Sequence, residues 1–237
     1  MKAHFLTRSL DRGAGKRRGM LVSLLATIAI AASTWSHVAP RLRDGTVAQR
    51  TVIHAIHEIF PRPVPYIDRN GMIASFPKVG FFMSTWGMQG YRDKERPVFA
   101  DLLRIRKPHF VLANVPALVS ALAGTSAGGP LHPDDMEVLR KHFVPYWGPV
   151  YVAGKQLHLE PATDTVWDVL IAGSYRLRSE GPVTIGNVLY VPGSTVNLDP
   201  GYVSFRSELK QDVTLMVDSA RGVPPYPPPT APLYLGL

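Results

Sequence analysis

The sequence contains no cysteine among its 237 residues. Disulfide bridges, thiolate metal sites and a cysteine nucleophile are therefore excluded. Acidic residues are scarce at the N-terminus, where residues 1–19 hold six basic side chains and a single acidic one, so five of the eight net positive charges lie there. Because the rest of the chain is close to balanced, its basicity does not indicate a phosphate-binding surface, and we predict no nucleic-acid partner.

Long hydrophobic runs are also rare. The apolar run Met20–Trp35 contains no charged residue and lies directly behind Lys16–Arg18. It is shorter than the roughly 20 residues that usually span a bilayer, although flanking residues can compensate. Basic residues before such a run favour a cytoplasmic N-terminus. We therefore predict a cytoplasmic leader at 1–19, a bacterial inner-membrane anchor at 20–36 and a periplasmic remainder. A cleaved signal peptide, with secretion to the periplasm, and a buried core helix are the alternatives.

Residues 44–161 show helical and strand patterns in alternation, which predicts a layered α/β module. A connector at His37–Arg43 precedes a helix that begins at Asp44 and ends before Pro61. Further helices are expected at Pro97–Arg106, Pro116–Ala123 and Pro133–Phe143, and strands at Val64–Ile67, Gly71–Phe76, His109–Asn114 and Pro149–Leu159.

After Pro161 the pattern changes to short runs, several alternating with period two, separated by turn residues such as Pro192-Gly193 and Pro200-Gly201. Proline followed by glycine supplies the backbone angles of a type II turn. This spacing predicts a small antiparallel β-sandwich at 162–218, followed by a proline-rich tail at 219–237. The expected fold class is α+β overall.

Three short motifs have simpler structural explanations. Gly124–Gly128 matches G-x-S-x-G, but the strand and helix of a nucleophile elbow do not flank it, so a loop is favoured. His54 and His57 share a helix face without a third metal ligand. The acids Asp134 and Asp135 suit the first turn of a helix. We therefore predict no metal, no cofactor and no catalytic residue at these positions.

Two segments are better candidates for ligand contact. Asp68 and Arg69 stand at a strand end or turn, where functional residues often lie, although a turn with a local ion pair is an alternative explanation. The second is Trp86–Tyr91, expected to be a glycine-rich aromatic loop, whose rings, amides and hydroxyls suit a saccharide. The candidate ligand-binding residues are Asp68, Arg69, Ser84, Trp86, Gln89 and Tyr91.

The segments Pro65–Met88 and Pro108–Asn114 resemble the C-terminal extracytoplasmic region of bacterial polytopic membrane glycosyltransferases. This superfamily includes protein mannosyltransferases and aminoarabinose transferases. Ala172–Leu177 and Val196–Tyr202 are similar to the small β-module that ends such proteins. The resemblance covers about residues 20 to 217 and places Met20–Trp35 where those enzymes have their last membrane helix.

The resemblance implies a role in cell-envelope glycan assembly without catalysis. Such enzymes carry their catalytic acids in an external loop between membrane helices, and this chain has one candidate span and no equivalent loop. No catalytic residue can therefore be carried over. The resemblance implies an accessory module, comparable to a detached tail of such a transferase.

Three hypotheses follow. The first is a membrane-tethered periplasmic accessory module that binds a saccharide or a polytopic glycosyltransferase. The second is a small glycan-acting enzyme with a site near Asp68 and Trp86–Tyr91. The third is a purely structural interaction protein whose proline-rich tail docks a partner.

Overall fold

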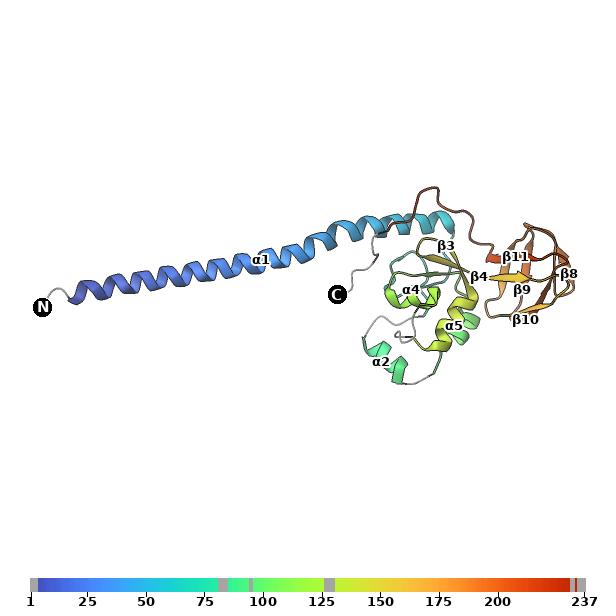
Figure 1. Cartoon of the computed structure of the whole chain (residues 1–237), viewed down its shortest axis with the longest axis horizontal. Coiled ribbons are helices and arrows are strands. Elements are labelled where there is room, and N and C mark those ends of the chain that lie inside the picture. Colours follow the sequence, from blue (N-terminus) through green and yellow to red (C-terminus); the bar gives the residue numbers. More distant parts are fainter. Residues whose placement is uncertain (1–3, 81–84, 94–95, 126–130, 231–232, 234–237) are drawn as a thin grey trace. The chain divides into compact units, whose positions relative to one another are not determined.

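The computed structural model describes residues 4–80, 85–93, 96–125, 131–230 and 233, and for 4–22, 37, 39–46, 85 and 86 it describes the backbone only. The chain forms two compact units, Met1–Val47 and Ala48–Leu237 (Figure 1). This division is coarser than the predicted modules, so the boundary at 161/162 stays a prediction.

Helix α1 runs from His4 to Ile59 and includes the whole apolar run. The predicted connector at His37–Arg43 is wrong, because the helix continues through it, Pro40 included. A proline removes one intrahelical hydrogen bond, and the helical residues on both sides supply the others. Within the described residues, no helix joins the length and the apolarity needed to cross a membrane. The membrane-helix part of the expected fold class is therefore not supported.

The second unit begins with the last turns of α1, which bury one face. Val52, Ala55, Ile56 and Ile59 are fully buried, at the helical spacing that the sequence predicts. They pack in one hydrophobic core with strand β1 (Tyr66–Ile67) and strand β2 (Phe110–Leu112). β1 and β2 are parallel, which places the residues that follow each strand at the same edge of the sheet.

Four short helices complete this layer: α2 (Thr85–Asp93), α3 (Phe99–Arg106), α4 (Pro116–Ala123) and α5 (Pro133–His142). The last three confirm the sequence prediction, with proline in the first turn of α4 and α5. The predicted loop at Trp86–Tyr91 is wrong, because α2 covers it. Its glycines cost helix stability, and the buried contacts of Tyr91 described below outweigh that cost.

Strand β4 (Val150–Leu159) is the centre of the larger sheet, in which seven strands of the described chain take part. Its first half pairs antiparallel with β2 and with β3 (Phe143–Trp147). Its second half pairs antiparallel with β11 (Gln211–Val217), which continues to β6 (Gly173–Arg178) and β9 (Thr195–Leu198).

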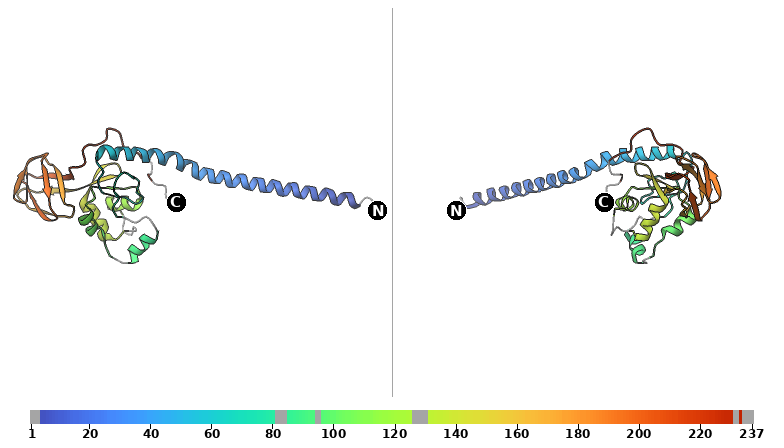
Figure 2. Two further views of the ribbon diagram at one scale, coloured as in Figure 1. Left: turned by 180° about the vertical axis from the view of Figure 1, so that it is seen from behind. Right: turned by 45° about the vertical axis from the view of Figure 1, so that its right-hand side comes forward.

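A second sheet of four strands has the order β5–β10–β7–β8, with β5 at Thr165–Val169, β10 at Gly201–Arg206, β7 at Val183–Ile185 and β8 at Val188–Tyr190. All its pairs are antiparallel. One core holds Trp167 and Phe205 from this sheet together with Tyr175 and Leu215 from the larger one. The orange and brown strands in Figure 2 enclose this core.

The proline-rich tail packs on its own chain. Trp147 donates its indole N–H to the backbone oxygen of Tyr226 at 3.1 Å, and Tyr226 donates its hydroxyl to Glu58 at 3.2 Å. Gln49 donates to the backbone oxygen of Leu233 at 2.7 Å. The described part of the tail thus covers α1 and β3.

Gly154 is the residue of β4 at which the partner strand changes from β3 to β11. A Cβ here would collide with the backbone oxygen of Leu215, which cannot move without breaking the β4–β11 ladder. Only glycine fits, because the two strands approach too closely for a side chain.

We expect Gly154→Ala to lower the free energy of unfolding by at least about 2 kcal/mol, the cost of forcing a group into a packed interior. Urea unfolding of the full chain, followed by circular dichroism, measures the effect. The matched control is Gly173→Ala in β6, where a Cβ meets no atom within 4 Å and the change should be nearly neutral. Equal effects of the two substitutions would refute the steric argument.

Candidate functional site

Asp68 directly follows β1 and is fully buried. Its Oδ1 accepts the backbone N–H of Gly71 and its Oδ2 accepts that of Met72, each at 2.8 Å. Asn114, which follows β2, donates its side-chain amide to Oδ2 at 3.2 Å. The strand predicted at Gly71–Phe76 is therefore wrong: the carboxylate holds the start of this segment in a turn, and only Lys78 forms an isolated bridge to β1.

Arg69 and Lys78 complete this cluster. Arg69 is half-buried, and its backbone oxygen accepts a hydrogen bond from the Lys78 ammonium at 3.0 Å. Burial lowers the pKa of Lys78, and the charge of Asp68 opposes that shift. The side-chain nitrogen of Asn70 is buried without a hydrogen-bond partner among the described atoms. The Asp68 carboxylate is occupied by three donors and does not face solvent, so its geometry is that of a structural group.

The other candidate residues lie on or near α2. Ser84 is outside the described residues, and for Trp86 the structure describes the backbone only. Gln89 is exposed and donates to Asp93, one turn later, at 2.8 Å. Tyr91 is buried, and its hydroxyl donates to Oδ2 of Asp135 at 2.7 Å and accepts the backbone N–H of His132 at 2.8 Å. Burial raises the pKa of Tyr91 strongly.

Asp135, on α5, is a fully buried carboxylate with a structural role that its position in the sequence does not disclose. Its Oδ1 accepts the backbone N–H groups of Val98 at 2.9 Å and Phe99 at 2.8 Å, and its Oδ2 accepts the hydroxyl of Tyr91. Val98 is the N-cap of α3 and has no side-chain capping group of its own. Asp135 thus caps α3 from another helix and ties α2, α3 and α5 together.

A pocket of about 380 Å³ opens beside α2 and α3, within the usual size range of ligand sites. Met88 and Tyr91 of α2 line it, and so does Ile105 of α3, whose side chain is 72% exposed. Among the described lining residues, Arg106 is the one that carries a charge. The lining consists of Gly80, Met88, Tyr91, Val98, Phe99, Leu102, Ile105, Arg106 and Leu131.

The structure therefore gives the candidate residues different surroundings. Asp68 and Arg69 belong to the turn after β1, whereas Tyr91 belongs to the pocket and to the Asp135 cluster. Among the described residues, no hydrogen bond or ion pair joins the two groups. Sequence reasoning missed Asn114 as the partner of Asp68; the signal that could have found it is that both residues follow a short apolar strand.

The weaker motifs have ordinary partners. His54 pairs with Glu58 at 3.1 Å along α1, and His57 lies 3.0 Å from the hydroxyl of Ser75. Ser126 of the G-x-S-x-G match is outside the described residues. The described side chains include no group of three histidine or acidic residues arranged to hold a metal ion.

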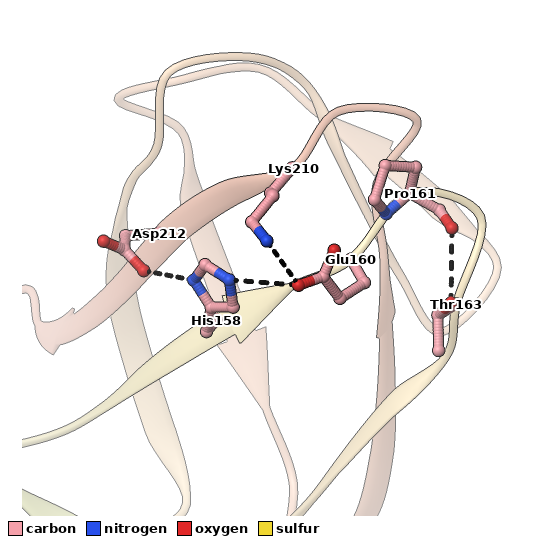
Figure 3. Close-up of polar contacts among 6 residues, drawn as sticks. All are labelled: His158, Glu160, Pro161, Thr163, Lys210 and Asp212. Atoms are coloured by element: carbon pink, nitrogen blue, oxygen red, sulfur yellow. Dashed lines mark hydrogen bonds and ion pairs between the residues drawn. The ribbon is translucent and has the colours of Figure 1, made fainter.

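A charged network not expected from the sequence lies on β4 and β11 (Figure 3). His158 contacts Asp212 at 2.8 Å and Glu160 at 3.3 Å, and Lys210 donates to Glu160 at 2.8 Å. The hydrogen bond to Asp212 is the main cause that raises the pKa of His158, and Lys210 is the main cause that lowers the pKa of Glu160. These exposed side chains face solvent and stabilise the strand pair weakly.

We expect Asp135→Asn to lower the free energy of unfolding by roughly 2 to 3 kcal/mol, because an amide has one acceptor oxygen for three donors and buries an unpaired N–H₂ group. Asp134→Asn, an exposed position in the same turn, is the matched control. Urea unfolding of both variants measures the difference. If the two variants are equally stable, Asp135 is not the capping group of α3.

We expect the His158 network to stabilise the fold at acidic pH and to lose this effect as the pH rises through the raised pKa of His158. The sign follows because the protonated ring is the form that the two carboxylates favour. Proton NMR titration of His158 measures it directly. Asp212→Asn should lower the pKa of His158 more than Glu160→Gln does; the reverse order would contradict the assigned cause.

Comparison of the chain with known proteins gave no matching family model, no similar curated protein and no similar solved structure. The resemblance to membrane glycosyltransferases therefore rests on the residues that carry it and stays a prediction.

Proposed function

We propose that this chain is a membrane-tethered, periplasmic accessory module of cell-envelope glycan assembly that binds a partner and does not itself catalyse. The single observation that supports binding most directly is the pocket beside α2 and α3, lined mostly by apolar side chains together with Arg106. The membrane tether and the glycan context come from the basic leader, the apolar run and the resemblance.

The first support is the exposed apolar surface of α1 before Val47. In its own unit this helix exposes Leu24, Leu25, Ile28, Ile30 and Trp35, because a lone helix has no neighbour to bury them. Exposed apolar surface of this kind is stabilised by a membrane or by a partner protein. The basic residues before it favour an orientation with residues 36–237 outside the cytoplasm.

The second support is that Asp68, the carboxylate on which the enzyme alternative depends, is not accessible to a ligand. That alternative requires the Asp68 carboxylate to face a ligand, but Asp68 is fully buried and accepts three hydrogen bonds. Asp135 is buried and equally occupied. A general acid or base has to come within hydrogen-bond reach of the substrate, and neither carboxylate is placed to do so.

The composition of the pocket favours one of the two kinds of partner. A sugar would leave most of its hydroxyl groups without hydrogen bonds against Met88, Leu102, Ile105 and Leu131, which is costly. Apolar side chains of a protein would not incur this cost. We therefore propose that the pocket docks an apolar segment of a polytopic glycosyltransferase in the same membrane.

The proline-rich tail is held to its own unit only in part. Pro224 and Leu233 are buried and Tyr226 bonds to Glu58, whereas Pro225, Pro227 and Pro228 are exposed. Docking of a partner by the tail would use these exposed rings. The purely structural hypothesis based on this tail therefore remains the alternative to docking at the pocket.

Deletion of the gene in its host should change the sugar composition of the purified envelope glycan. Plasmid-borne wild-type chain should restore it, and Ile105→Asp should not, because a carboxylate at the mouth of the pocket repels an apolar partner. Monosaccharide analysis measures the outcome, and C-terminal fusions to alkaline phosphatase report whether each chain reaches the periplasm.

Val223→Asp is the matched control, because Val223 is also an exposed apolar residue but does not line the pocket. It should complement as well as the wild type. An unchanged glycan in the deletion strain would overturn the proposed function. Full complementation by Ile105→Asp would overturn the pocket as the docking site.

A further inference from the structure

We infer that the outer face of strands β5 and β10, next to α3, is a saccharide-binding surface built from Tyr202, Asp168 and Arg104. It is separate from the pocket beside α2, and the inference does not rest on the proposed function. The ligand class is a neutral oligosaccharide of pyranose rings with equatorial hydroxyl groups.

Tyr202 is the most exposed large hydrophobic residue described, with 81% of its surface accessible. It points away from the core, since Val203 and Phe205 on the same strand pack inward. Its ring makes no contact with another aromatic ring and its hydroxyl has no hydrogen bond within the described structure. The ring is therefore available on its face and at its polar tip, as a stacking residue must be.

Asp168 lies directly opposite Tyr202 in the antiparallel β5–β10 pair, so the two side chains leave the same face of the sheet. The Asp168 carboxylate lies 3.8 Å from the guanidinium of Arg104, which extends from α3. Both side chains remain partly accessible, at 38% and 49%. An aromatic ring, an acceptor and a donor are thus adjacent on one open surface.

Buried contacts and strand pairing hold the backbone under this surface in place. The imidazole of His142, at the end of α5, lies 2.8 Å from the backbone oxygen of Asp168. The same buried ring is 6.1 Å from Trp167 in the core. The two strands are paired along five consecutive residues, from Gly201 to Phe205. The three side chains therefore stand on a rigid support, which limits the entropy lost on binding.

This arrangement suits sugars for a chemical reason. A pyranose ring with equatorial hydroxyls presents axial C–H groups on its faces, which pack on an aromatic ring, and hydroxyls at its rim, which need both donors and acceptors. Asp168 can accept from one hydroxyl while Arg104 donates to the next. Because the two charges compensate, a neutral sugar is favoured over an anionic one. An open surface with one ring predicts a Kd of about 1 mM.

The test is an NMR titration of the full-length, ¹⁵N-labelled chain in phosphocholine micelles, which contain no sugar. The probes are cellotetraose and chitotetraose, each up to 10 mM. At least one should shift the amides of Gly201–Ser204 and Val166–Val169. Tyr202→Thr, which keeps a residue favourable for strands, should weaken binding roughly five- to tenfold. Tyr202→Phe should retain most of it.

Leu189→Ala is the matched control, because Leu189 is equally apolar and 66% exposed on the same sheet, two strands away from β10. It should leave the titration unchanged. Absence of shifts with both probes, or binding that Tyr202→Thr does not weaken, would overturn the inference. Failure here would leave the Ile105→Asp complementation result untouched, so the two proposals are tested separately.

Discussion

The structure depends on one strand, β4, that belongs to both hydrophobic cores. Val150, Val152 and Ala153 pack with the helices, whereas Leu157 and Leu159 pack in the core between the two sheets. Between them stands Gly154, where the strand meets β11 too closely for any side chain. Because an extended strand paired on both sides is stiff, the two cores are built as one unit, and Ala48–Leu237 is accordingly one compact unit. The shared strand also fixes the neighbourhood in which Arg104 of one layer meets Asp168 of the other.

Within the helical layer, two buried carboxylates supply stability that longer helices and strands would otherwise provide. β1 has two residues and α3 eight, so neither is stable alone. Asp68 holds the turn after β1, and Asp135 caps α3 while receiving the hydroxyl of Tyr91. The three donor groups around each carboxylate offset part of the free-energy cost of burying it. The same hydrogen bonds make Asp68 and Asp135 unsuitable for acid–base chemistry, because neither carboxylate has an oxygen that is free to reach a ligand.

The sequence predicts much of this fold because most helices and strands have recognisable signals in their own residues. α4 and α5 begin at a proline, α1 shows a helical stripe of buried residues, and the strands after Pro161 are separated by Pro-Gly and Gly-Asn turns. The failures are those that need tertiary information. α2 contains two glycines and forms a helix because Tyr91 is anchored by Asp135, a residue 44 positions away. The segment after Gly71 is apolar like a strand but is held in a turn by Asp68, to which Asn114 also donates a hydrogen bond. The sequence does not predict β3, because Pro145 interrupts its pattern.

The candidate site shows the same limit. Residue types can be read from the sequence, whereas contacts between residues far apart in the chain cannot. Residue type alone identified Asp68 and Tyr91 as unusual, and both make buried polar contacts, yet the contacts serve the fold. The accessible chemistry lies instead where the residues look ordinary in sequence: Ile105 in a short amphipathic helix, and Tyr202 in a strand with period-two alternation. A fold of short elements has to use its conspicuous polar groups for its own stability. In both proposals, binding is assigned to side chains that the core does not need, so exposure, and not residue rarity, is what the two proposed surfaces share.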